Sequence, residues 1–390
     1  MITVEQALSS LLALVDPLDA EEVDLADAGG RVLIRSAQAT RAQPPFAASA
    51  MDGYALRASE ARAGATFTVI GESAAGHRFD GKIAAGQAAR IFTGAPVPQG
   101  ADRIIIQEDV QRDGDTITLN QNLDSSFYLR PAGGDFAEGT KLEAPCRLGP
   151  SEVALLAAMN VARVHVTRRP EVAIMATGDE LVMPGENPGP DQIIASNSFG
   201  LKVLVESIGA NARLLPIARD TAASLETAFG LARGADLIVT IGGASEGDHD
   251  LVGQVAADLG MDRAFYKVAM RPGKPIMAGR LEGAALCGLP GNPVSALVCG
   301  QVFLIPMIRK MLGLGGAAMT RQSAPLSINV GANGPREHYM RARLDGAGIA
   351  PFERQDSSLL TVLSAANALL IRAPHDGPRN AGDLVEYIPL

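Results

Sequence analysis

The chain has 390 residues, of which 47% are hydrophobic and 20% are charged, and its formal net charge is −9. This length exceeds one ordinary domain, so we expect a globular protein of two to four domains. The acidic balance argues against nucleic acid as a main partner, because phosphate backbones need a basic face. Cys146, Cys287 and Cys299 lack CxxC or zinc-ligand spacing, which predicts a reducing, cytoplasmic setting without disulfides.

The sequence predicts neither a signal peptide nor a membrane span. The N-terminal stretch MITVEQALSSLLALVD contains acids that interrupt its apolar run, unlike a secretory signal. The longest apolar candidate, residues 293–311, carries Gln301 and Arg309. This composition fits a buried helix better than a helix in lipid. We therefore expect no membrane partner.

The first half of the chain is predicted to be mostly β-structure. Residues 3–15 have the apolar spacing of a helix, and residues 23–40 alternate as strand and turn. Residues 41–54 are rich in Pro, Gly and Ala, which predicts an ordered loop. Residues 66–119 hold short strands punctuated by glycines, which favours an all-β insert. A short helix and then a strand are expected over residues 151–159 and 161–167.

From Glu171 onward, strands and helices alternate. Helices are expected over residues 197–208, 221–233 and 251–259, with Asp220 or Thr221 capping the second. This alternation indicates a doubly wound, mostly parallel sheet. After about Gly316 the chain returns to short β segments, so a small β-rich C-terminal domain is expected. The strands of the α/β part are expected at residues 172–177, 212–218 and 236–241.

Three Gly-rich loops follow predicted strands or open predicted helices of this α/β domain. Ligands of doubly wound sheets bind beyond the carboxyl ends of the strands, so these loops would share one crevice. Each loop alone could be a tight turn, but three on one sheet edge favour a ligand site. Pro293 suits the first position of a helix, whose free N–H groups would attract an anion. The loop residues are Gly178, Glu180, Gly242, Gly243, Ser245, Pro290, Gly291, Asn292 and Pro293.

Fixed cations lie between the second and third of these loops. Lys267, Arg271 and Lys274 belong to a segment that Pro272 and Pro275 stiffen. Lys and Arg hold phosphates and other oxyanions, Arg in bidentate fashion. A solvated basic face is the alternative, but rigid prolines would serve no purpose there. The pattern predicts a site for an anionic, phosphate-bearing ligand.

Carboxylates also gather near the predicted strand ends. Glu180, Asp220, Asp248 and Asp250 offer hard oxygen atoms that suit Mg²⁺ beside a ligand phosphate. Taken singly, Asp220 and Asp248 are more often helix caps. Asp250 lies past the cap position and is the better ligand candidate, so Glu180 and Asp250 are the predicted metal ligands.

Polar residues on Gly/Pro loops mark a second candidate region in the first half. Asp52 stands in PPFAASAMDGYAL, where an acid has few apolar neighbours, although an Asx-turn is the simpler interpretation. Thr93, Arg130 and Asp135 stand on similar loops, and sites commonly lie on such loops. The five histidines have no metal or triad spacing.

Six motifs in this order resemble the molybdopterin molybdenumtransferases of the MoeA/gephyrin type. They are SAMDGYAL, IFTGAPVPQGAD, TGDEL, GGASEGDHD, PGKP and GLPGNPVSA, and the likeness covers essentially the whole chain. The resemblance implies insertion of molybdenum from molybdate into adenylylated molybdopterin, with release of AMP and a requirement for Mg²⁺. It also implies transient contact with other molybdenum-cofactor biosynthesis proteins and with molybdoenzyme acceptors.

The resemblance further implies an elongated homodimer of four-domain subunits. The active cleft would lie between the α/β domain of one subunit and the β-rich insert of the other. The fold class is then multidomain, with a doubly wound α/β domain, a β-rich insert, an elongated linking domain and a small C-terminal β-barrel-like domain. The implied boundaries are residues 1–19 plus 170–316 for the α/β domain, 20–40 plus 139–169 for the linking domain, 41–138 for the insert and 317–390 for the C-terminal domain.

The family's cleft residues can be carried over position by position. Asp52, Asp250, Lys267 and Arg271 take catalytic roles, with Asp52 or Asp250 as the acid that protonates a leaving oxygen. Lys274 would help to neutralise charge on the departing AMP. The remaining matches, all in substrate-binding roles, are Thr93, Arg130, Asp135, Glu180, Asp220, Pro290, Pro293, Arg341 and Ser357.

The chain departs from the family at a few of these positions. Glu246 replaces a usual apolar residue, Arg271 replaces a frequent Lys, and Ser358 stands where Gly is usual. Two alternatives from other functional classes stay open, an adenylyltransferase that acts on molybdopterin and a non-catalytic pterin-binding scaffold. A Rossmann dehydrogenase is disfavoured, because no GxGxxG follows the first α/β strand.

Overall fold

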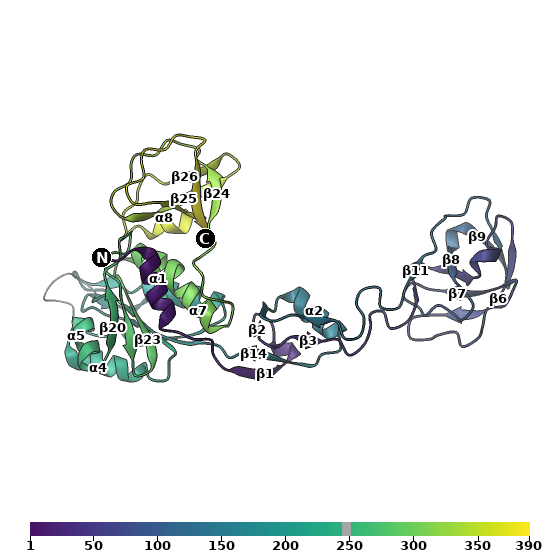
Figure 1. Ribbon diagram of the computed structural model, residues 1–390, viewed down its shortest axis with the longest axis horizontal. Helices are drawn as coiled ribbons and strands as arrows, with labels where there is room; N and C mark the ends of the chain where they lie inside the picture. Colours follow the sequence, from purple (N-terminus) through teal and green to yellow (C-terminus); the bar gives the residue numbers. More distant parts are fainter. Residues whose placement is uncertain (244–250) are drawn as a thin grey trace.

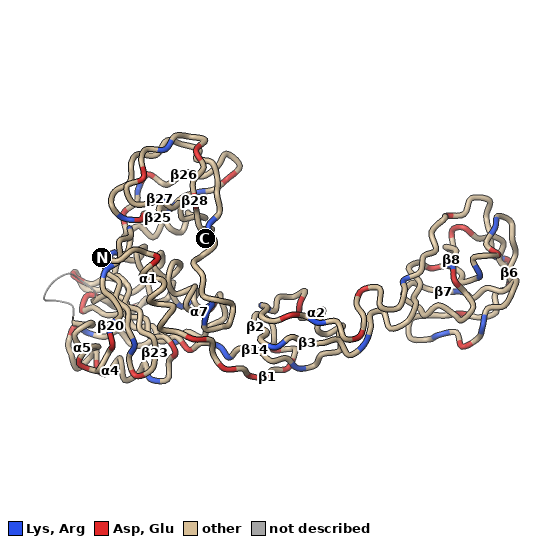
Figure 2. The backbone as a smooth tube through the Cα atoms, in the orientation of Figure 1, with Lys and Arg blue, Asp and Glu red and all other residues tan. Residues whose placement is uncertain are grey.

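The computed structural model describes residues 1–243 and 251–390. The molecule is elongated: an α/β domain and a C-terminal domain lie side by side at one end, and a β-rich insert lies at the other (Figure 1). A slender linking region joins the two ends, and the chain passes through it twice. Acidic and basic residues are interspersed over all four parts (Figure 2). The domain boundaries given above stay predictions.

The α/β domain is built on a six-stranded sheet in the order β18-β15-β19-β23-β22-β20. The first four strands of this order are parallel to one another. β22 pairs antiparallel with β23, and β20 pairs antiparallel with β22, so the sheet is mostly parallel as expected. The strands are β15 (Glu171–Ala176), β18 (Asn211–Leu214), β19 (Leu237–Ile241), β20 (Asp262–Tyr266), β22 (Met277–Leu281) and β23 (Ala284–Leu289). A small parallel pair, β16 (Leu181–Val182) and β17 (Ile193–Ile194), lies outside this sheet.

Helices cover both faces of this sheet because successive strand residues point to opposite faces. On β15, Val172 and Ile174 join one buried cluster, while Ala173 and Met175 join the other. The first face carries α1 (Val4–Ala13), α3 (Asn197–Ser207), α6 (Pro293–Cys299) and α7 (Ile305–Met311). The second face carries α4 (Ala222–Leu231) and α5 (Leu251–Asp258). A Thr3–Gln6 capping box starts α1, and the Thr221 hydroxyl caps α4.

One helix of the described residues, Pro293–Met311, is long and apolar enough by length and composition to cross a membrane. It consists of α6, the π-helical turn η4 (Gly300–Leu304) and α7. Most of this helix is buried within the protein. It packs against the sheet and α1, in agreement with the sequence prediction of a buried helix.

The linking region and the insert are antiparallel for the most part. In the linking region, α2 (Pro150–Ala158) accompanies β1 (Ala20–Asp24), β2 (Val32–Leu33), β3 (Ala37–Gln38), β12 (Lys141–Leu142), β13 (Cys146–Arg147) and β14 (Arg163–Thr167). The insert holds a six-stranded sheet of β5 (Gly53–Leu56), β6 (Thr66–Ser73), β7 (Gln87–Ile91), β8 (Arg103–Ile106), β9 (Val110–Asp113) and β10 (Thr116–Leu119). Beside it, β4 (Ala48–Ser49) pairs with β11 (Leu129–Arg130).

The C-terminal domain is tied to the α/β domain by a shared sheet. Its own elements are β24 (Gln322–Pro325), β25 (Glu337–Asp345), β26 (Gly348–Pro351), α8 (Leu360–Ala365), β27 (Ala368–Arg372) and β28 (Leu384–Pro389). The two-residue strand β21 (Met270–Arg271), which comes from the α/β part of the chain, pairs with β25 so that Arg271 lies beside His338. This pairing carries one predicted cationic residue to the junction of the two domains.

Candidate functional site

A cavity of about 670 Å³ opens beyond the carboxyl ends of β15, β19 and β23; we call it the strand-end cavity. The three Gly-rich loops singled out in the sequence all line it. Three polar residues at the start of α3, Ser196, Asn197 and Ser198, line it as well. The structure brings together nine predicted residues here: Gly178, Glu180, Asp220, Gly242, Gly243, Pro290, Gly291, Asn292 and Pro293.

The glycines of these loops allow the strand ends to lie very close together. Gly242 has a φ of +95°, and a Cβ atom on it would lie 2.8 Å from the Thr177 carbonyl oxygen. A Cβ atom on Gly178, whose φ is +146°, would lie 2.3 Å from the Glu180 carboxylate. Only glycine fits such a close approach without displacement of its neighbours. The cavity therefore depends on these glycines for its shape.

The charge of the strand-end cavity differs from the sequence prediction. Among the lining residues that the structure describes, the charged ones are Glu180 and Asp220, both acids. The start of α6 is also a weaker anion site than predicted. Pro293 has no N–H, and the Val294 N–H donates to the Ser357 carbonyl oxygen at 3.0 Å. The prediction of a helix start with free N–H groups is therefore wrong for Val294, because a C-terminal-domain loop that is distant in sequence uses that group.

Cationic residues lie beside this cavity rather than within its described lining. Arg341 is fully buried, and one Nη atom donates to the Asp356 carbonyl oxygen at 2.9 Å. Its Nε and other Nη atoms have no hydrogen-bond partner among the described residues. Burial, and then the nearby charge of Arg271, lower the pKa of Arg341. A buried guanidinium with unused N–H groups beside a second cation, the arginine pair, is suited to an oxyanion.

The loop of Asp356, Ser357 and Ser358 connects the arginine pair to the strand-end cavity. The Asp356 carboxylate accepts hydrogen bonds from the N–H and hydroxyl groups of Ser358, which itself lines the cavity. These bonds hold the pKa of Asp356 below its usual value, so the loop is fixed at neutral pH. Ser358, a departure from the family pattern, therefore stabilises this loop and contributes to the cavity wall.

The other two predicted cations come from the same connecting segment. Lys267 has a φ of +73°, which is unusual for a residue with a Cβ atom and is a form of strain often found at functional sites. Its ammonium group lies 5.1 Å from the centre of the Tyr266 ring. The Lys274 carbonyl oxygen accepts the Val268 N–H at 3.0 Å, which closes the segment into a compact turn.

In the insert, Asp52 and Thr93 are bound to each other. The Thr93 N–H and hydroxyl groups donate to one Asp52 oxygen at 2.7 and 2.8 Å. The backbone bond, then the hydroxyl bond, and more weakly the Arg90 charge lower the pKa of Asp52. Asp52 therefore has a structural use despite its few apolar neighbours, since its carboxylate joins two turns. Asp52 stays ionised at neutral pH, which disfavours it as a proton donor.

Arg130 and Asp135 line a second cavity, of about 660 Å³, in the insert; we call it the insert cavity. Gly94, the neighbour of Thr93, lines it too. The pairing of β4 with β11 places Arg130 beside Ala48, and the Gly94 N–H donates to the Ser49 carbonyl oxygen at 2.8 Å. The structure thus brings all four predicted insert residues to one region.

Within one chain these two groups of residues do not meet. The insert and the α/β domain lie at opposite ends of the molecule (Figure 1). Ser245 and Asp250, together with Glu246 and Asp248, lie outside the described residues. Elsewhere in the described chain, no three His, Cys, Asp or Glu side chains are grouped so as to hold a metal ion. Glu180 and Asp220 still offer two carboxylates in one cavity.

Sequence reasoning missed three contributors. Asn197 donates from its side-chain amide to the Gly291 carbonyl oxygen at 2.7 Å and so links two loops of the strand-end cavity. Arg90 donates to the carbonyl oxygen of Gly53 and stacks on the Tyr54 and Phe92 rings. Arg219 contacts the Gly178 loop. The motifs FTGA and TGDEL were detectable signals. Arg90 stands only two residues before FTGA, but its contact with Gly53 is long-range, and Arg219 itself lies far in sequence from TGDEL.

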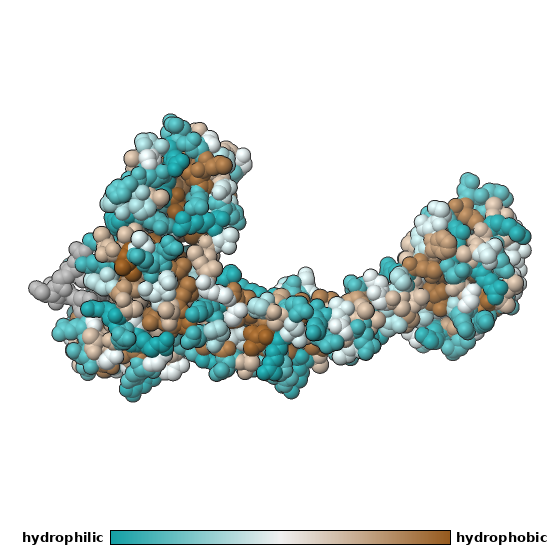
Figure 3. Space-filling view, viewed as in Figure 1, coloured by the Kyte–Doolittle hydropathy of each residue, from teal (hydrophilic) through white to brown (hydrophobic). Residues whose placement is uncertain are grey.

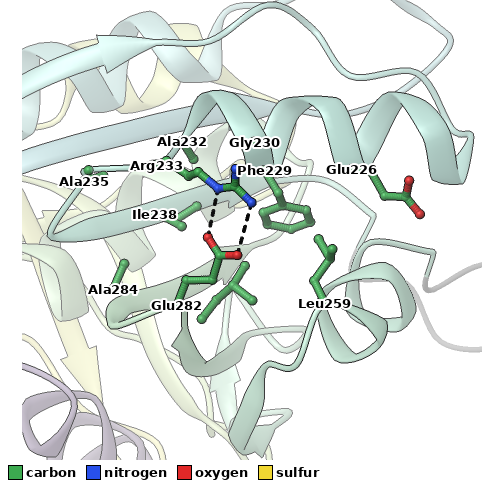
Figure 4. Close-up of a pocket in the computed structure, with 12 residues that line it drawn as sticks. Glu226, Phe229, Gly230, Ala232, Arg233, Ala235, Ile238, Leu259, Glu282 and Ala284 are labelled. Carbon is green, nitrogen blue, oxygen red and sulfur yellow. Dashed lines mark hydrogen bonds and ion pairs between the residues drawn. The ribbon is translucent and has the colours of Figure 1, made fainter.

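A smaller cavity of about 90 Å³ lies at the opposite edge of the α/β sheet (Figure 4). Phe229 and Leu259 line it together with the exposed ion pair of Arg233 and Glu282, whose Nε and Oε2 atoms are 3.1 Å apart. Ala284, at the start of β23, marks this as the amino end of the strands. Ligands of doubly wound sheets bind at the other edge, and exposed ion pairs contribute little stability.

Three domain families match the chain in order. The MoeA N-terminal region (domain I and II) matches residues 2–160, the probable molybdopterin binding domain matches residues 173–310, and the MoeA C-terminal region (domain IV) matches residues 323–390. This chain belongs to the MoeA family. Membership confirms the predicted family and fold class and places the chain in molybdenum cofactor biosynthesis.

Named relatives of this MoeA chain extend over most of its length. A molybdopterin molybdenumtransferase of Haemophilus influenzae is 38% identical over 317 residues, which cover 80% of this chain and 78% of the relative. A molybdopterin molybdenumtransferase of Nostoc sp. is 34% identical over 394 residues, which cover 95% of this chain and 90% of the relative. A solved molybdopterin biosynthesis MoeA protein from Pyrococcus horikoshii has a TM-score of 0.84 at 26% identity, with 100% of both chains covered.

Proposed function

We propose that this MoeA chain transfers molybdenum from molybdate into adenylylated molybdopterin, releases AMP and forms the molybdenum cofactor. One observation supports this most directly: a strand-end cavity with an acidic lining lies beside a buried arginine that has unused N–H groups. The acids of the cavity suit the N–H and hydroxyl donors of a pterin or ribose, and the buried arginine suits an oxyanion. The substrates combine these two chemistries.

In this proposal the arginine pair and the nearby lysines hold the anionic groups. Arg341 and Arg271 would bind molybdate or a substrate phosphate, and Lys267 and Lys274 would offset charge on the departing AMP. As the two dithiolene sulfurs of the pterin bind molybdenum, oxygen atoms leave molybdate and must accept protons. Asp250 is proposed either as that proton donor or as a ligand of Mg²⁺, and Lys267 as a further donor. The bonds from Thr93 favour the ionised form of Asp52.

Mg²⁺ fits the acids of the strand-end cavity. Glu180 and Asp220 both line it, and Asp250 is a further predicted ligand. Two carboxylates plus substrate phosphates are an ordinary set of ligands for this ion. Bound there, Mg²⁺ would supply charge neutralisation at the phosphoanhydride.

We further propose a cytoplasmic homodimer whose cleft is shared. Asp52, Thr93, Arg130 and Asp135 of one subunit would face the strand-end cavity of the other, because the two groups lie at opposite ends of one chain (Figure 1). The insert exposes Met51 by 41% and Phe127 by 52%, and apolar surface gathers on it (Figure 3). Transient contacts would deliver the substrate from other biosynthesis proteins. Similar contacts would pass the product on to acceptor molybdoenzymes.

The deciding experiment measures AMP release from purified adenylylated molybdopterin, with and without molybdate and Mg²⁺. We expect release that requires both. Release without molybdate would contradict coupled insertion, and formation of the adenylylated substrate from ATP would favour an adenylyltransferase. Binding with no release under any condition would favour the scaffold function.

A further inference from the structure

Arg219 lies directly behind the loop that forms one wall of the strand-end cavity. One of its Nη atoms lies 3.0 Å from the Asp179 carbonyl oxygen, 3.2 Å from that of Leu181 and 3.5 Å from that of Gly178. A single guanidinium group therefore contacts three carbonyl oxygens of one four-residue turn. The two N–H groups of this one Nη atom are shared among the three oxygens, and the planar guanidinium fixes their direction.

The residues on either side of Arg219 also bind this turn. The Asp179 carboxylate accepts the Asp220 N–H at 3.2 Å, and the Gly178 N–H donates to the Ala218 carbonyl oxygen at 3.1 Å. The Ser224 hydroxyl at the start of α4 accepts the Arg219 N–H at 2.9 Å. Arg219 is thus anchored by its own backbone to α4 while its side chain holds the turn.

The turn that Arg219 holds carries the residues that face the cavity. Gly178, Glu180 and Leu181 line the strand-end cavity, and so does Asp220, whereas Arg219 itself is not part of the lining. The Glu180 carbonyl oxygen also accepts the Ile193 N–H at 2.8 Å, which links β17 to the same turn. Loss of the Arg219 contacts would loosen the turn that carries Glu180 and adjoins β17.

We propose that Arg219 is a positioning residue that holds Glu180 and Asp220 in place to bind the adenylylated substrate and its product AMP. This inference rests on the proposed function. It requires no contact between Arg219 and the ligand, because the effect passes through the backbone of residues 178–181. The turn has few other side-chain bonds, so its conformation should respond to the loss of this one group.

The test compares Arg219→Ala and Arg219→Lys with Arg213→Ala. Arg213 is a matched control, because it also donates to backbone carbonyl oxygens, those of Leu231 and Arg233, away from the strand-end cavity. We expect Arg219→Ala to raise the KM for adenylylated molybdopterin and the Kd for AMP about tenfold, with a smaller change in kcat. Lys should restore part of the affinity, and Arg213→Ala should stay near the wild-type values.

A second measurement separates this inference from the proposed function. Hydrogen exchange of the amides in residues 178–181 and of Asp220 should be faster in Arg219→Ala than in Arg213→Ala, at equal Tm. If wild-type protein releases no AMP while exchange differs as stated, the proposed function fails but Arg219 still positions the turn. Equal exchange, or a KM within twofold of wild type in Arg219→Ala, would overturn the assignment.

Discussion

At the scale of single residues, the protein controls charge through a few short bonds. The carboxylate of Asp52 accepts two bonds from Thr93, and bonds to the charged form lower its pKa. Arg341 and His338 have the opposite problem, since burial disfavours their charged forms. The positive charge of Arg271 further disfavours the charged forms of Arg341 and His338, because like charges repel. An incoming oxyanion would relieve this repulsion.

Replacement of Thr93 by Val removes one of the two donors to Asp52. We expect the pKa of Asp52 to rise part of the way to its usual value, because the backbone N–H bond, the larger cause of the shift, stays. The measurement is a carboxyl-carbon NMR titration of Asp52. Thr66→Val, an exposed change on β6, is the control. An unchanged Asp52 titration in Thr93→Val would contradict the assigned bond.

His338 should make stability fall in mild acid. It is 6% exposed, its Nε2 atom has no partner among the described residues, and burial followed by the Arg271, Arg341, Arg336 and Arg372 charges lowers its pKa to about 4. The unfolded chain binds this proton near pH 6.5 and the folded protein only near pH 4. The stability that neutral His338 supports is therefore present above pH 6.5 and is lost as pH falls toward 4.

The expected size of this loss is on the order of 1 kcal/mol per pH unit within that window. His338→Gln should flatten the dependence of Tm on pH between about 6.5 and 4. His77→Gln, a change at an exposed histidine of the insert, should leave the slope as in the wild type. Parallel slopes for wild type and His338→Gln would refute the role of His338.

At the scale of elements, short segments that cross between domains position the cations. β21 leaves the α/β sheet and joins β25, so Arg271 lies at the junction with the C-terminal domain. Gly273 then turns the chain back with a φ of +107°. A Cβ atom there would lie 2.3 Å from the buried Cys299 sulfur. The turn between Arg271 and Lys274 is thus packed directly against α6.

Gly273→Ala should destabilise the protein and weaken oxyanion binding. Gly283→Ala is the matched control, because Gly283 has a similar φ of +89° but open space around it. We expect Gly273→Ala to lose about 1–3 kcal/mol more stability than the control, owing to the clash with Cys299. Urea unfolding of both variants checks this. Equal losses would mean that the packing of this turn tolerates a methyl group.

At the scale of the whole molecule, the elongated shape separates two groups of polar residues. The insert carries Asp52, Thr93, Arg130 and Asp135, and the other end carries the strand-end cavity and the arginine pair (Figure 1). A rigid chain of this shape cannot bring the two groups together by itself. In a two-fold symmetric dimer, each cleft could combine one group from each subunit.

Mixed dimers test this arrangement. Asp52→Asn and Arg271→Ala chains are each expected to be inactive, but after mixing and subunit exchange half of the dimers are heterodimers with one intact cleft. Activity should recover to roughly a quarter of the wild-type rate. A mixture of Asp52→Asn with Asp135→Asn should not recover, because both changes lie in the same half of the cleft. No recovery in the first mixture would exclude a shared cleft.

Local patterns in the sequence predicted part of the α/β domain, because apolar periodicity and Gly-rich turns act over a few residues. They predicted β15 and β19, helices such as α1 and α4, and the meeting of three loops at one sheet edge. Only the tertiary structure decided the contacts between distant segments. The Ser357 carbonyl oxygen accepts the Val294 N–H, and the Thr93 hydroxyl donates to Asp52. Arg341 is buried with N–H groups that have no partner among the described residues. Each depends on burial and on long-range packing, which no local pattern encodes.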